Sequence, residues 1–138
     1  MKRNERITKI MTNSPTCVQL GQKLSEVHQV MSKGGFHHVP VVDGKKLVGI
    51  LSSTDLLRVS YEHGRDARQV DAVLDHTVSI QQLMQSDMVT LKEDQTVRDA
   101  IGHFSKGQFH SLPVVDGAGH LAGIVTTTDV MQYMLEQY

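Results

Sequence analysis

The chain has 138 residues, with 14 Lys plus Arg against 15 Asp plus Glu, three Tyr, three Phe and no Trp. This near-neutral balance argues against a nucleic-acid-binding protein, which would normally present a basic surface and stacking aromatic side chains. The single cysteine excludes an intramolecular disulfide and a thiolate zinc cluster, and no apolar run approaches the roughly 18 residues of a membrane span. We therefore expect a cytoplasmic protein about the length of one ordinary domain, with no nucleic-acid or membrane partner.

The first half predicts two helices and three strands in a fixed order. A short extended segment over 16–20 precedes a helix whose apolar stripe is Leu24, Val27 and Met31, with Gly34 as its end. Strands over 39–42 and 47–51 follow, separated by an Asp-Gly turn that is typical of a hairpin. A second helix begins near Thr54, and we expect the prolines of both halves, Pro40 and Pro113, at strand starts or edges.

The second half repeats this order after a polar segment. Residues 61–76 predict a helical extension and linker with a weak apolar face. An extended segment over 88–91 then precedes a helix that opens with Thr96-x-x-Asp99, a capping-box pattern, and ends at Gly107. Strands over 112–115 and 121–125 and a helix from Thr128 complete the half.

The two halves are copies of one another, first at a shift of 73 positions (32 to 105) and then, after one inserted residue, of 74 (54 to 128). The matched segments are 32–34 with 105–107, 40–44 with 113–117, and 54–55 with 128–129. The predicted fold class is α/β (α+β), with two β-α-β-β-α repeats related by pseudo-two-fold symmetry in one module that shares one core. We expect repeat 1 over 7–60, the linker over 61–76 and repeat 2 over 77–138.

At these residues the chain resembles a tandem pair of CBS domains, a Bateman module. The resemblance rests on three features that occur once in each half. They are the pair Ile10-Met11 or Leu83-Met84, the motif His-x-[VL]-Pro-Val-Val-Asp-Gly, and the motif Gly-Ile-[LV]-[ST]-[ST]-Thr-Asp. It implies a stand-alone regulatory module that binds AMP, ADP, ATP or S-adenosylmethionine in the cleft between the repeats. It further implies a homodimer that signals through a change of conformation or assembly, to an effector protein or to a second copy.

The resemblance also implies the ligand-binding residues. The family's carboxylate for the ribose hydroxyls matches Asp55 and Asp129, and its nearby hydroxyls match Ser52 and Thr126. The helix starts at Thr54 and Thr128 would offer N–H groups to an anion. Positions that face phosphates match His37, His38, His110 and Ser111, and those that line the adenine slot match Thr16, Val18, Met88 and Thr90.

Simpler interpretations stand beside these. Asp55 and Asp129 could be helix N-caps that need no ligand, Ser52 and Thr126 could only end strands, and Cys17 could be a small buried residue. The histidines lack chelating spacing, and no catalytic motif is present, so we expect neither a metal site nor an enzyme and no required cofactor. The alternative function is a structural or protein-interaction dimerisation module with a vestigial or empty cleft.

Overall fold

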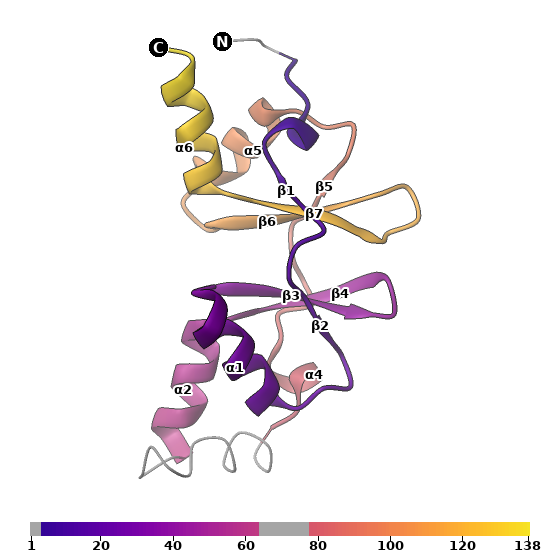
Figure 1. Ribbon diagram of the computed structural model, residues 1–138, viewed down its shortest axis with the longest axis vertical. Helices are drawn as coiled ribbons and strands as arrows, with labels where there is room; N and C mark the ends of the chain where they lie inside the picture. The colour runs from indigo at the N-terminus through magenta and orange to yellow at the C-terminus, as the bar shows by residue number, and fades with distance from the viewer. Residues whose placement is uncertain (1–3, 64–77) are drawn as a thin grey trace. The chain divides into compact units, whose positions relative to one another are not determined.

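The computed structural model describes residues 4–63 and 78–138 (Figure 1). The chain forms two compact units, Thr16–Met88 and Met1–Pro15 with Val89–Tyr138, which we call the repeat-1 unit and the repeat-2 unit. These units cut across the linear repeats, because the opening segment of each repeat lies in the unit built by the rest of the other repeat. Most of the predicted linker lies outside the described residues.

The repeat-1 unit is a three-stranded sheet with helices. The sheet has the order β2-β3-β4, with β2 parallel and β4 antiparallel to β3. Its elements are β2 (Val18–Gln19), α1 (Leu24–Gly34), β3 (His38–Asp43), β4 (Lys46–Ser52), α2 (Ser53–His63) and α4 (Ile80–Leu83).

The repeat-2 unit has the same plan with one more strand. Its sheet has the order β1-β7-β6-β5, with β5 parallel to β6 and the other pairs antiparallel. Its elements are the 3-10 helix η1 (Ile7–Lys9), β1 (Thr12–Asn13), β5 (Leu91–Lys92), α5 (Val97–Phe104), β6 (Ser111–Val115), β7 (Leu121–Thr126) and α6 (Thr127–Glu136). The α/β class and the β-α-β-β-α order of both repeats are confirmed.

The helix signals are confirmed with small shifts in position. Thr96 and Asp99 form the predicted capping box at α5, and α1 begins after Lys23 without a side-chain cap. Helix α1 ends one residue later than predicted, because Gly34 is still helical and Gly35 takes the left-handed conformation with φ of 66°.

Each unit has its own cluster of buried apolar side chains, where the sequence suggested one core shared by both repeats. Ile7, fully buried, lies in the repeat-2 core, and Ile80, 1% exposed, lies in the repeat-1 core. These two residues match at the repeat shift of 73 (7 to 80). Each core is therefore completed by the opening segment of the other repeat.

The same segments pair with the last strand of each hairpin. In the repeat-2 unit β1 pairs with β7, with Thr12 opposite Ile124. In the repeat-1 unit Gln85 forms a bridge with Ile50, through Ile50 N to Gln85 O at 3.0 Å and Gln85 N to Ile50 O at 2.9 Å. One short edge strand and one bridge thus occupy equivalent places.

Pro40 and Pro113 lie in the central strands β3 and β6, so their predicted placement at strand starts or edges is wrong. Pro40 is opposite Ile50, whose N–H and C=O both bond to Gln85 and therefore point away from β3. Parallel pairing with β2 begins only at Val41. The missing N–H of Pro40 consequently costs the sheet no ladder hydrogen bond.

Candidate functional site

In both units the last strand of the hairpin runs directly into the final helix, and this junction holds most of the predicted site residues. The hydroxyl of Ser52 accepts the N–H of Asp55 at 3.1 Å, and the Asp55 carboxylate accepts the N–H of Ser52 at 3.2 Å. Thr126 and Asp129 make the same two bonds, at 3.1 and 2.8 Å. Each junction is therefore closed by a reciprocal capping box.

This geometry corrects the simpler interpretation of the aspartates. Thr126 is the N-cap of α6 and Asp129 is the third helical residue, and the bonds of Ser52 and Asp55 place them alike at α2. Ser52 and Thr126 do end strands, and they cap helices as well. Because the Ser52 and Thr126 amides each use one carboxylate oxygen, Oδ2, the acceptor capacity for a ligand lies mainly on Oδ1.

Most backbone N–H groups at the two helix starts already have partners within the protein. The carbonyl of His37 accepts the N–H of Ser53 at 2.8 Å, and that of His110 accepts the N–H of Thr127 at 3.0 Å. With the third amide bonded to the capping hydroxyl, only the second amide, of Thr54 or Thr128, lacks a partner within the described parts of the chain. The helices begin at Ser53 and Thr127, one residue earlier than predicted.

Sheet pairing brings further predicted residues to the same place. His38 is opposite Ser52, and Ser111 is opposite Thr126, so each pair projects to one face of its sheet. Residues just before β2 and β5 lie at this edge too, since those strands run parallel to β3 and β6. We call this group the helix-start edge: Thr16, His38, Ser52 and Asp55 in the repeat-1 unit, and Thr90, Ser111, Thr126 and Asp129 in the repeat-2 unit.

Three predicted residues have surroundings that differ from the expectation. The Val18 side chain is 1% exposed in the repeat-1 core, so only its backbone remains for a ligand. Ser111 is buried at 7% exposure. Met88 is the last residue of the repeat-1 unit, whereas Thr90, predicted beside it, lies in the repeat-2 unit.

His37 and Thr54 also line a surface pocket of about 370 Å³ between the end of α1 and the start of α2. The pocket is mainly apolar. Its lining residues are His28, Met31, Ser32, Gly35, Phe36, His37, Ser53, Thr54, Leu56 and Leu57.

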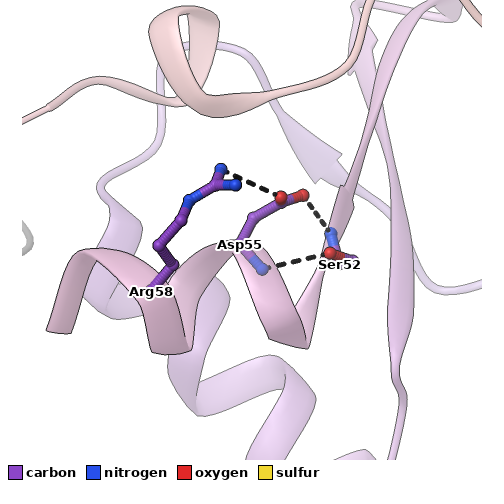
Figure 2. A network of polar contacts seen from close by, with 3 residues as sticks. All are labelled: Ser52, Asp55 and Arg58. Carbon is purple, nitrogen blue, oxygen red and sulfur yellow. Dashed lines mark hydrogen bonds and ion pairs between the residues drawn. The ribbon is translucent and has the colours of Figure 1, made fainter. Parts of the chain in front are cut away.

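Arg58 is a site residue that the sequence reasoning missed. Its Nη2 donates to Asp55 Oδ1, a contact drawn in Figure 2. The two atoms are 3.3 Å apart, and the side chains of Arg58 and Asp55 are 58% and 24% exposed. Spacing of i to i+3 on a helix is the signal that could have found this pair. An ion pair this exposed contributes about 0–1 kcal/mol, so it orients the carboxylate without locking it.

Cys17 is exposed rather than buried as predicted, although partial burial raises the pKa of its thiol. Over residues 4–63 and 78–138, no three or more His, Cys, Asp or Glu side chains are grouped to hold a metal ion. None of the helices described there is long and apolar enough to cross a membrane.

Paired α/β units, each with a capped strand-to-helix junction, define a class of tandem-repeat modules. The family model for the CBS domain matches residues 7–62 and 80–136, and the chain belongs to this family. The tandem CBS pair suggested by the repeated motifs is thereby confirmed.

Known relatives share the sequence and the fold. MJ1225 of Methanocaldococcus jannaschii is 30% identical over 132 residues, which are 94% of this chain and 47% of that protein. Its crystal structure has a TM-score of 0.83 and covers 97% of this chain and 49% of that chain. This chain thus spans about half the length of that relative.

Two solved structures match along nearly their whole length. The CBS domain pair of protein MJ0100, in complex with 5′-methylthioadenosine and S-adenosyl-L-methionine, has a TM-score of 0.77 at 25% identity and covers 94% of this chain and 98% of that chain. CBSX2 of Arabidopsis thaliana, in complex with AMP, has a TM-score of 0.81 at 23% identity, with 96% and 98% covered, and shows the fold alone.

Proposed function

We propose that this chain is a regulatory module that binds an adenosine derivative, such as AMP, ADP, ATP or S-adenosylmethionine, at its helix-start edges. The observation that carries the proposal is the duplicated junction in which one carboxylate oxygen of Asp55 or Asp129 accepts the N–H of the capping residue, while the other oxygen is not used by that N–H. A carboxylate accepts the two hydroxyls of a ribose, and neighbouring hydroxyl and imidazole groups can donate to phosphate. The MJ0100 pair, which holds adenosine derivatives, supports this ligand class.

In this proposal the ligand regulates and is not converted. A sensor responds only when the ligand binds one conformation or assembly better than another, and the response reaches an effector protein or a second copy. A catalytic role would instead require the ligand to be consumed. Chromatography of the same ligand incubations checks this, because a product peak would contradict a purely regulatory role.

Thermal unfolding with AMP, ADP, ATP, S-adenosylmethionine and NAD tests the proposal. A ligand at 100 times its Kd adds about 2.7 kcal/mol to the free energy of unfolding and raises Tm by several degrees. We expect Asp55→Ala combined with Asp129→Ala to abolish this rise. A cleanly folded protein that responds to none of these compounds would support the alternative, a dimerisation module with an empty site.

Asp99→Ala is the matched control for these variants. Asp99 makes the same capping-box bonds with Thr96 at the start of α5, outside the helix-start edges. All three substitutions remove a capping interaction worth about 1 kcal/mol each, so all lower Tm in the absence of ligand. Only the changes at Asp55 and Asp129 should remove the rise caused by ligand.

We also propose that the chain forms a homodimer. Leu57 on α2 is 67% exposed and Met131 on α6 is 60% exposed, and the two occupy matched positions at the repeat shift of 74 (57 to 131). Leu135, 73% exposed, extends the apolar surface of α6. Each unit thus exposes large apolar side chains to water at an equivalent position on α2 or α6. Burial of these side chains against a second copy of the chain would be favourable.

A further inference from the structure

The two helix-start edges share their capping box but differ at the third residue after the aspartate. In the repeat-1 unit this residue is Arg58, whose Nη2 lies 3.3 Å from Asp55 Oδ1. In the repeat-2 unit it is Gln132, which is exposed. Within the described parts of the chain, Oδ1 of Asp129 has no hydrogen-bond partner.

This difference affects Oδ1, the carboxylate oxygen that must accept at least one of the ribose hydroxyls. In both units Oδ2 already accepts the N–H of the capping residue, at 3.2 Å for Asp55 and 2.8 Å for Asp129. A ribose diol donates two O–H groups to a carboxylate, so Oδ1 must take at least one of them. At Asp55 a guanidinium already takes one of the two acceptor positions of Oδ1 and crowds the other, so the diol competes with Arg58 for access to that oxygen.

Arg58 weakens ligand binding at Asp55 without preventing it, because the ion pair between the two residues is exposed. Arg58 is 58% exposed and Asp55 is 24% exposed, and ion pairs of this kind are weak and open readily. A diol can displace Arg58, at the cost of the lost ion pair. Asp129 carries no such cost.

On the basis of the proposed function, we propose that Arg58 is a specificity-determining residue that makes the repeat-1 edge the weaker site. A ribonucleoside with free 2′ and 3′ hydroxyls fills the repeat-2 edge at Asp129 first. Arg58 and Gln132 thus make the two aspartates unequal as ribose acceptors, and exchange of these two side chains exchanges which site binds first.

Reciprocal variants of the full chain test this inference. Adenosine is the first probe, because it has the diol and no phosphate. Titration followed by amide NMR separates the sites, through the signals of Ser52 and Thr54 in one unit and of Thr126 and Thr128 in the other. We expect the wild type to shift Thr126 and Thr128 at the lower concentration.

Arg58→Gln should tighten adenosine at the repeat-1 edge by about 1.5- to 5-fold, and Gln132→Arg should weaken it at the repeat-2 edge by the same factor. Both side chains are exposed, so neither change should affect folding. Arg58→Lys is the conservative control: it keeps a cation and should retain the wild-type order of occupancy.

Parallel titrations with AMP separate competition from phosphate contact. Competition predicts that Arg58→Gln tightens AMP as well as adenosine. A variant that weakens AMP but leaves adenosine unchanged would show Arg58 to be a phosphate ligand and would overturn the inference. If the wild type binds and neither substitution changes the order in which the two sites fill, the inference about Arg58 is wrong and the proposed function stands. If none of the proteins binds any of the compounds, the proposed function is wrong as well.

Discussion

Two different side chains hold the two hairpin turns of this duplicated fold. In the repeat-2 unit Asp116 Oδ1 accepts the N–H of His120 at 3.0 Å and of Ala118 at 2.9 Å. In the repeat-1 unit the amide of Gln19 reaches across from β2 and makes two bonds with Gly44, at 3.0 and 3.1 Å. A carboxylate titrates and an amide does not, so the two turns should respond differently to acid.

We expect the repeat-2 turn to loosen in acid before the repeat-1 turn. The backbone N–H of His120, then that of Ala118, holds the pKa of Asp116 below its usual value, and the His120 ring adds a smaller effect. A lowered folded pKa stabilises the turn above the unfolded value of about 3.9, and this stabilisation is lost as the pH falls through the folded pKa. Amide hydrogen exchange between pH 5 and pH 2.5 measures the loss at Ala118 and His120.

Gly44 in the same protein is the internal control, and Asp116→Asn is the matched variant. The variant should show the weaker protection at all pH values, without the additional loss in acid. Equal acid sensitivity of Gly44 and of Ala118 would contradict the prediction.

The residues of the candidate site that could be predicted from the sequence are those that occur at matched positions in both repeats. The motif that ends each repeat identified Ser52, Asp55, Thr126 and Asp129, and the structure joins them as two capping boxes. It did not reveal that the aspartates are third helical residues, because a cap and its partner are both polar residues near a helix start. Burial was harder still: Val18 and Cys17 are one residue apart, yet only their strand face decides that one is buried and the other exposed.

At the scale of elements, a methionine packs over a glycine of the last hairpin strand in each unit. A Cβ at Gly49 would lie 2.5 Å from Met84 Sδ and 3.2 Å from Gln85 O. A Cβ at Gly123 would lie 2.5 Å from Met11 Sδ and 2.8 Å from Thr12 O. These glycines let the opening segment of each repeat approach the last hairpin strand of the other repeat closely.

We expect Gly123→Ala to destabilise the protein by about 1–3 kcal/mol, the usual cost of overpacking, and Gly49→Ala to cost less. The methionine can turn aside in both cases, but the backbone carbonyl of Thr12 is closer than that of Gln85 and cannot. Urea unfolding of each variant measures the difference.

Gly102→Ala is the control for these substitutions. Gly102 lies within α5, and a Cβ there would meet nothing within 4 Å. Alanine at this position should raise stability by about 0.4–1 kcal/mol, through helix propensity and a less flexible unfolded chain. Equal destabilisation by all three substitutions would rule out close packing as the cause.

At the scale of the whole molecule, the exposed apolar residues of α2 and α6 predict the oligomeric state. We expect the wild type to elute as a dimer, and Leu57→Glu with Met131→Glu to shift it to a monomer, because a buried carboxylate without a partner is strongly unfavourable. Light scattering coupled to size exclusion measures the mass. Gln81→Glu, which adds a negative charge at an exposed position on α4, is the control and should leave the mass unchanged. A wild type that is monomeric at all concentrations would contradict the proposed dimer.

The repeated order of elements could be predicted, but the composition of the units could not. Apolar periodicity and the Asp-Gly turns determine strands and helices locally, and these agree with the structure over most of both repeats. Ile7 and Ile80 occupy matched positions at the repeat shift of 73, so a comparison of sequence segments assigns each to its own repeat. Which core each isoleucine enters depends on the path of the chain, and periodicity carries no information about that path.

The exchange of leading segments has a consequence for synthesis on the ribosome. Residues 16–88 emerge before residues 89–138, so the repeat-1 unit, with Ile80 in its core, can close first. Ile7 and β1 emerge before the repeat-1 unit, yet β7, the partner strand of β1, is made only after that unit. The apolar side chain of Ile7 must therefore stay uncovered while the repeat-1 unit forms, until β7 has been made.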